Sequence, residues 1–175
     1  MTNDTSLIIP VAAAAFVQPF RIQYLHRPGV TMPPHITVRS PFKSLGELTE
    51  QDYHTLTTLF ASFSPFVFTL GRLARFAETG VLYLAPEPVE PFMALYQALF
   101  ARYPVPPENH SSVVFHLTLA RRQPTNLDQW EAEFHRLYDA QLPIKAMATE
   151  VSLYEEREEQ WFKITSFPLG KPDVF

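Results

Sequence analysis

The sequence contains two copies of a short pattern whose residue types could do chemistry on a phosphate group. Each copy is a histidine, an apolar residue, a threonine and a second apolar residue; one begins at His35 and the other at His116. In an extended strand, alternate side chains share a face. We therefore expect His35 and Thr37 to point to one side of one strand, and His116 and Thr118 to one side of another, while the apolar residues face a core.

Two imidazoles that face one cleft suit a reaction in which one proton is removed while another is donated. The ordinary pKa of histidine, about 6.5, allows one neutral and one protonated copy near neutral pH. General acid–base catalysis of this kind typically contributes a factor of about 10² to 10⁴ in rate. A threonine hydroxyl on the same face can donate a hydrogen bond to a phosphate oxygen. The pattern predicts His35 and His116 as acid and base, in either order, with no metal ion or other cofactor, since no third ligand stands at a recognisable spacing.

Composition narrows the class of protein. At 175 residues and 46% hydrophobic content, the chain fits one domain with a substantial core. The net charge of −4 argues against a general nucleic-acid coat, whereas a nucleotide or one end of an RNA is an acceptable partner. The absence of cysteine excludes disulfides, a thiolate nucleophile and cysteine-based metal sites. No apolar run reaches the roughly 18 residues of a membrane span. We therefore expect a cytoplasmic protein without membrane association. A monomer is the favoured oligomeric state.

The histidine segments belong to an order of predicted elements that occurs twice. Hydrophobic periodicity, turn residues and two predicted capping boxes, at Thr49 with Asp52 and at Thr125 with Asp128, define this order. The order is strand, helix, histidine strand, capped helix and strand. The first round is expected at 6–10, 11–25, 35–39, 49–63 and 66–70, with a bend or break of its first helix at Pro19. The second round is expected at 81–85, 87–103, 113–119, 125–138 and 144–154. A final strand is expected at 161–167.

This repetition, roughly over 6–73 and 81–167, predicts an α+β protein that forms a single bilobal domain over 1–175. The two lobes would be similar and related by a pseudo-twofold axis. Each would be an antiparallel sheet with helices packed outside. The two histidine strands would then face each other across an active cleft between the lobes.

Several further residues are candidates for binding a substrate. Arg39 is expected on the strand face of His35, where it would contact a phosphate or, alternatively, form an ion pair at the surface. Phe42, Tyr83 and Tyr154 could stack on a base at the rim of the cleft. Packing in the core is the preferred role for each of these three rings, because 14% of the chain is aromatic.

The two motifs and their surroundings resemble the two-histidine phosphoesterase superfamily, which includes the 2'-5' RNA ligases and cyclic nucleotide phosphodiesterases. The likeness is closest to a small bacterial 2'-5' RNA ligase-like branch and spans most of the chain. It is carried by PPHITVR at 33–39, VLYLAPEP at 81–88 and FHLTL at 115–119. The resemblance implies that His35 and His116 are acid and base and that Thr37 and Thr118 bind phosphate. Arg122 would be a further phosphate contact, although Ala120 precedes it where relatives often have glycine.

The resemblance and the residues together predict a metal-independent phosphodiesterase for RNA-type substrates. It would hydrolyse a 2',3'-cyclic phosphate or cleave or ligate a 2'-5' linkage, with hydrolysis favoured where water is abundant. The alternative is a non-catalytic protein that binds nucleotides or RNA ends in a retained phosphate cleft. A third hypothesis is an interaction module with a vestigial site.

Overall fold

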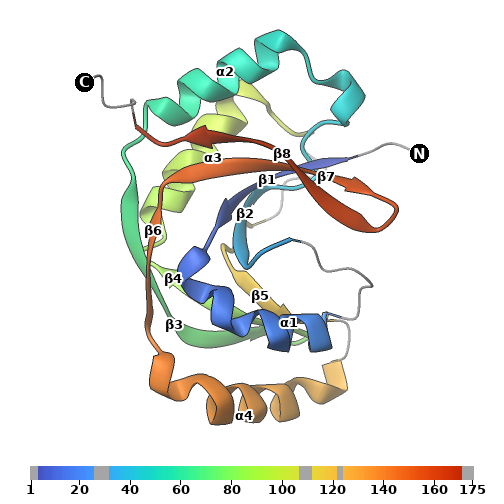
Figure 1. Ribbon diagram of the computed structural model, residues 1–175, viewed down its shortest axis with the longest axis vertical. Helices are drawn as coiled ribbons and strands as arrows, with labels where there is room; N and C mark the ends of the chain where they lie inside the picture. Colours follow the sequence, from blue (N-terminus) through green and yellow to red (C-terminus); the bar gives the residue numbers. More distant parts are fainter. Residues whose placement is uncertain (1–3, 26–31, 107–111, 122–123, 171–175) are drawn as a thin grey trace.

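The computed structural model describes residues 4–25, 32–106, 112–121 and 124–170. Its strands form two four-stranded antiparallel sheets, which helices flank (Figure 1). The predicted α+β class with two antiparallel sheets is confirmed. The first sheet has the order β2-β1-β7-β8, with β1 at Thr5–Pro10, β2 at His35–Arg39, β7 at Glu150–Arg157 and β8 at Gln160–Pro168. The second has the order β5-β4-β3-β6, with β3 at Phe66–Phe76, β4 at Val81–Glu87, β5 at Leu117–Ala120 and β6 at Ile144–Ala148.

The four α-helices of the described chain are α1 at Gln18–Tyr24, α2 at Glu50–Ala61, α3 at Glu90–Arg102 and α4 at Leu127–Tyr138. The segment predicted as one helix over 11–25 begins with a 3-10 helix at Ala12–Val17, and only then continues as α1. Pro19 lies in the first turn of α1. A proline there loses no helical hydrogen bond, so the expected split lies just before Pro19, where the 3-10 helix ends and α1 begins. Within the described residues, no helix is both long and apolar enough to cross a membrane.

One predicted capping box is present and the other is wrong. Asp52 donates its backbone N–H to the Thr49 hydroxyl at 3.2 Å and accepts the Thr49 N–H at 2.9 Å, which starts α2 as expected. Thr125, in contrast, lies inside a short 3-10 helix, and Asn126 is the N-cap of α4 without a side-chain cap. The carboxylate of Asp128 instead pairs with Arg75 at 2.7 Å, so a tertiary ion pair replaces the local cap.

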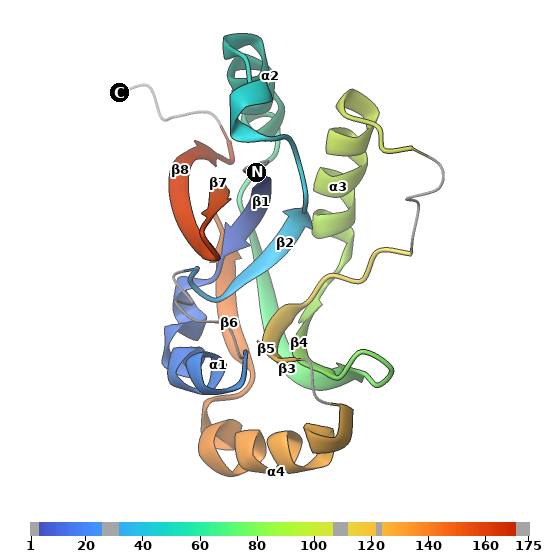
Figure 2. The ribbon, with the colours of Figure 1, turned by 90° about the vertical axis from the view of Figure 1, so that its right-hand side faces the viewer.

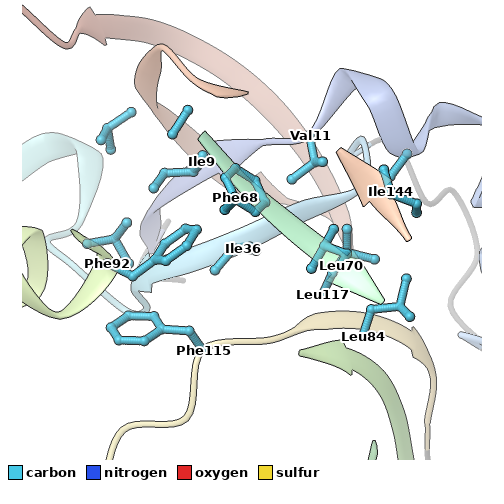
Figure 3. Close-up of a cluster of buried hydrophobic side chains, with 14 of the residues drawn as sticks. Ile9, Val11, Ile36, Phe68, Leu70, Leu84, Phe92, Phe115, Leu117 and Ile144 are labelled. Atoms are coloured by element: carbon cyan, nitrogen blue, oxygen red, sulfur yellow. The ribbon is translucent and has the colours of Figure 1, made fainter. Parts of the chain in front are cut away.

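A single hydrophobic core joins the two sheets. Side chains of β1 and β2 meet those of β3, β4 and β5 there, and rings from α3 and the segment before β5 pack against them (Figure 3). Each strand supplies its apolar face through the period-2 alternation of its sequence. The members labelled in Figure 3 are Ile9, Val11, Ile36, Phe68, Leu70, Leu84, Phe92, Phe115, Leu117 and Ile144.

The repeat appears in the sheets, but its two halves exchange strands. In each sheet a motif strand, β2 or β5, lies at the edge and pairs with the strand before it, β1 or β4. However, β3 from the first half joins the second sheet, and β7 and β8 from the second half join the first. The lobes are therefore not the contiguous segments 6–73 and 81–167. The predicted boundary falls inside the β3–β4 hairpin, and such a short connection favours pairing between its own strands.

The strand expected over 144–154 is also two strands. β6 pairs with β3 in the second sheet and β7 pairs with β1 in the first, so the chain passes from one sheet to the other at Thr149. The exchange places the edge strands β2 and β5 beside each other (Figure 2). α1 packs beside β5, and α3 packs beside β2.

Candidate active site

A cleft of about 430 Å³ lies where the two motif strands meet, and both motifs line it. His35 and Thr37 reach it from β2, and His116 and Thr118 from the start of β5. All four side chains are half-buried, while the apolar residues between them, Ile36 and Leu117 among them, are buried in the core. The structure thus brings together the two halves of the predicted site.

The two imidazoles are held in the same way. The Nδ1 atom of His35 lies 2.7 Å from the carbonyl oxygen of Pro33, and that of His116 lies 2.7 Å from the carbonyl oxygen of Val114. A carbonyl oxygen only accepts, so Nδ1 donates in both rings. Nε2 then carries the lone pair of each neutral ring and is the atom through which a proton would be taken up or given away.

The cleft disfavours a positive charge on either ring. Burial, followed by the positive charge of Arg21, lowers the pKa of His35 to about 3. The pKa of His116 is also lowered, mainly by burial and then by Arg121. Both imidazoles are therefore neutral at neutral pH. The negative charge of a bound anion would oppose that of the arginines and favour protonation.

Two arginines make one part of the cleft positive. Arg21 of α1 is 3% exposed and lines the cleft, and its Nε donates to the carbonyl oxygen of Thr118 at 2.9 Å. Burial and the nearby Arg121 lower the pKa of Arg21 to about 10, so it stays protonated at neutral pH. Arg121, just after β5, lines the same cleft. Two guanidinium groups beside two hydroxyls make a site that suits a phosphate or another oxyanion.

A family model for the 2'-5' RNA ligase superfamily matches residues 9–160, a range that contains both motifs. The chain belongs to this superfamily.

Solved structures with the superfamily's two-sheet fold resemble the chain over nearly its whole length. A structure described as a phosphoesterase has a TM-score of 0.60 at 17% sequence identity, and the match covers 97% of this chain and 99% of the chain in that structure. LigT of E. coli in complex with 3'-AMP has a TM-score of 0.59 at 14% identity, with 97% and 99% covered. TT0787 of Thermus thermophilus has a TM-score of 0.59 at 16% identity, with 97% and 100% covered. No curated protein matches the sequence.

In this superfamily member, Arg39 does not share the cleft face of His35. Ile8 pairs with Thr37 and Leu7 with Arg39, which leaves Val38 as an extra residue in β2. Such a bulge reverses the alternation beyond it. Arg39 is therefore 8% exposed, and it donates through Nη1 to the carbonyl oxygen of Tyr103 at 3.0 Å. The expectation that it faces the cleft is wrong. Arg39 is also buried and, among the described residues, forms no ion pair, so the alternative of a surface ion pair is not found there.

The three candidate aromatic residues pack behind the cleft and are not among its lining residues. Phe42 packs edge-on against Tyr103, with ring centroids 5.0 Å apart. The ring of Tyr83 packs against the imidazole of His116, with ring centroids 5.3 Å apart. Tyr154 is buried in a small apolar cluster together with Ile8, Met32 and Trp161. Arg122 lies outside the described residues.

Trp161 and Arg21 line the cleft although the sequence analysis did not select them. Arg21 had a detectable signal. Val17, Phe20, Arg21 and Tyr24 stand at i, i+3, i+4 and i+7, so the arginine lies on the apolar stripe of its helix, where a charge needs a specific partner. Trp161 gave no such signal, because only the β7–β8 hairpin brings it to the site. Among the described residues, no group of three or more His, Asp or Glu side chains is placed to hold a metal ion.

Proposed function

We propose that this protein is a phosphodiesterase for RNA-type substrates, which hydrolyses a 2',3'-cyclic phosphate or cleaves a 2'-5' linkage without a metal ion. The observation that carries the proposal is a pair of imidazoles, each anchored through Nδ1, that line one cleft with two threonines and two arginines. Membership of the 2'-5' RNA ligase superfamily supports phosphodiester chemistry. The nucleotide complexes of E. coli LigT, with 3'-AMP and with ATP, support a nucleotide-like substrate.

The proposed mechanism gives a role to the two histidines, the two threonines and the two arginines of the cleft. One neutral imidazole takes a proton from water as its oxygen forms a bond to phosphorus. The other imidazole, protonated, gives its proton to a ribose oxygen as the bond from that oxygen to phosphorus breaks. The products are a phosphate monoester and a free ribose hydroxyl. Thr37 and Thr118 would donate hydrogen bonds to the non-bridging oxygens, and Arg21 and Arg121 would stabilise the negative charge. In ligation, a hydroxyl of a second RNA end would take the place of water, form the new bond to phosphorus and lose its proton to the base, while the same ribose oxygen leaves. Hydrolysis prevails where water is abundant.

The test is the rate of hydrolysis of a 2',3'-cyclic nucleotide in the presence of a chelator. We expect the chelator to have no effect, and His35→Ala and His116→Ala each to lower kcat by about 10² to 10⁴, the usual contribution of an acid or base. His54→Ala is the matched control, because His54 is exposed on α2 and is not among the residues that line this cleft. Unchanged rates in both cleft variants would contradict the proposal.

A second candidate is a protein that binds nucleotides or RNA ends without turning them over. The observation in its favour is that burial lowers the pKa values of both imidazoles, so that no protonated acid is present at neutral pH before a ligand binds. It predicts saturable binding of a cyclic nucleotide, with no product after prolonged incubation at any pH. A bell-shaped pH–rate profile would exclude it.

A further inference from the structure

The cleft carries opposite charges on its two sides. Its two arginines lie on the side of β5, where Arg21 donates to the carbonyl oxygen of Thr118 and Arg121 follows the strand. On the side of the first sheet, three carboxylates line the same cleft. They belong to Asp4, Glu156 and Glu159. A ligand in the cleft therefore meets positive charge on one side and negative charge on the other.

The register of the first sheet gives the distance between the carboxylates and the first motif. Ile8 of β1 pairs with Thr37, and both line the cleft. The next residues of this chain segment on the same face are Ser6 and then Asp4, which also line it. The carbonyl oxygen of Asp4 accepts the backbone N–H of Glu156 at 3.0 Å. At about 3.3 Å per residue, these two acidic residues stand about 13 Å along the sheet from the position of Thr37.

Between the first motif and the carboxylates, the floor of the cleft is apolar. Ile8, Met32 and Trp161 line it, and together with Tyr154 they form a hydrophobic cluster that is separate from the main core. Trp161 pairs with Glu156 across the β7–β8 hairpin, so the apolar floor extends as far as the carboxylates. The cleft volume of about 430 Å³ lies in the range of pockets that hold one small ligand. The apolar floor suits the uncharged sugar and base of a single nucleotide.

The turn of the β7–β8 hairpin holds Glu159 in an unfavourable backbone conformation. Glu158 and Glu159 form the two-residue loop, with φ values of 51° and 64°. Loops of this kind usually contain glycine or asparagine, because other side chains are strained in the left-handed region. Glu159 lines the cleft, whereas Glu158 is exposed and is not among the described lining residues. The needs of the turn therefore do not explain the carboxylate of Glu159, and its neighbour is a matched control for it.

We propose that Asp4, Glu156 and Glu159 are specificity-determining residues, which repel a second phosphate and so restrict the site to nucleotides whose one phosphate is the reacting one. The inference rests on the proposed function and names its substrate class, the nucleoside 2',3'-cyclic phosphates without a 5'-phosphate. In ribose, the 2' and 3' oxygens stand on the edge opposite the base and the 5' carbon. A cyclic phosphate at the motifs therefore directs the base and the 5' carbon over the apolar floor and toward the carboxylates. A 5'-phosphate, and the rest of an RNA chain attached to it, would bring like charges together there.

The first test compares the binding of adenosine 3'-monophosphate and adenosine 3',5'-bisphosphate, which differ by one phosphate. By calorimetry at neutral pH, we expect the wild-type protein to bind the monophosphate about tenfold more tightly, and Glu156→Gln and Glu159→Gln each to reduce this ratio about threefold. Glu159→Lys should reduce it further. Glu158→Gln, which removes the same charge from the same turn, should leave the ratio within about twofold of the wild-type value. Equal wild-type affinity for the two ligands, or equal ratios in Glu159→Gln and Glu158→Gln, would overturn the inference.

A glycine variant separates the charge of Glu159 from its place in the turn. Glu159→Gly removes the carboxylate and relieves the left-handed strain, so urea unfolding should show no loss of stability. The ratio of affinities should nevertheless fall about threefold, as in Glu159→Gln. A glycine variant that keeps the wild-type ratio would show that the carboxylate does not act on the ligand.

The second test measures turnover of 2',3'-cyclic AMP and of its 5'-phosphorylated derivative. We expect the wild-type protein to favour the first in kcat/KM by about tenfold at low salt, and by less as added salt screens the carboxylates. In the double variant Glu156→Gln, Glu159→Gln, the preference should be largely lost, through a lower KM for the phosphorylated substrate. A wild-type preference for the phosphorylated substrate, or one that the double variant retains in full, would overturn the inference.

These tests separate the two proposals. Should the wild-type protein turn over neither substrate, the proposed function is wrong, and the binding ratios still measure whether the carboxylates reject a second phosphate. Should it hydrolyse both substrates equally well, the proposed function stands and the specificity inference is wrong.

Discussion

At each motif histidine, one backbone carbonyl determines which ring nitrogen is available for chemistry. The two carbonyls, of Pro33 and Val114, each stand two residues before their histidine. The anchoring is therefore local to each motif, and the same short sequence pattern reproduces it on both strands. A motif of a few residues thus specifies both the ring and its tautomer.

Anion binding should depend on pH through these two rings. Burial lowers the pKa values of both rings, and the charge of an anion favours their protonation, so binding of an anion is coupled to uptake of protons. Sulfate stays dianionic between pH 7.5 and pH 5.5. Over this range, for each proton that binding takes up, we expect sulfate to bind up to about tenfold more tightly per unit decrease in pH. Calorimetric titration at several pH values measures this. A dissociation constant that does not change with pH, or that changes equally in a His35→Asn, His116→Asn double variant, would contradict it.

At the scale of the element, the bulge in β2 decides which side chains reach the substrate. Alternation correctly placed Thr37 on the cleft side, because the strand is regular up to that residue. One extra residue, Val38, then turns Arg39 toward Tyr103 and brings Ser40 to the cleft in its place. A bulge depends on how a partner strand packs, so the sequence of β2 alone does not reveal it.

A pair of variants in β2 tests this geometry. Thr37→Val keeps the shape of the side chain and removes the hydroxyl, so kcat/KM for a cyclic nucleotide should fall by about 10- to 150-fold, the value of a hydrogen bond to a charged group. Arg39→Met should leave kcat/KM within about twofold, because Arg39 faces away from the cleft. Steady-state kinetics distinguish the two, with urea unfolding as a check that both variants are folded. A large kinetic loss in Arg39→Met would place this arginine in the site after all.

For the whole molecule, the order of elements was predictable and the membership of each sheet was not. The periodicity of apolar residues identified most helices and strands, and the two histidine patterns identified the repeat. Which sheet takes up β3 or β7 depends on competition between long-range pairings, and for β3 the hairpin that joins it to β4 at the repeat boundary favours the second sheet. The same holds for the site, because its histidines and threonines come from a local pattern whereas Arg21 and Trp161 reach it only through tertiary packing.

The strand exchange predicts that neither half of the chain folds alone. A fragment of residues 1–77 contains β3 but lacks the other strands of its sheet, and it leaves β1 without β7. We expect the fragments 1–77 and 78–175 each to lack a cooperative thermal transition, and a mixture of the two to regain one together with the cleft. Circular dichroism melts of each fragment and of the mixture measure this. A cooperative transition in either fragment by itself would show that the lobes are independent.

The described elements cross from one sheet to the other twice, through α2 into β3 and at Thr149 from β6 into β7. Two chain connections limit the relative motion of the sheets more than one connection would, because any opening between the sheets has to move both of them. We therefore expect ligand exchange to depend on side chains and on the tip of the β7–β8 hairpin, with little relative movement of β2 and β5. If the proposed function holds, we expect such a scaffold to accept a small end more readily than a long polymer that the two sheets would have to close around.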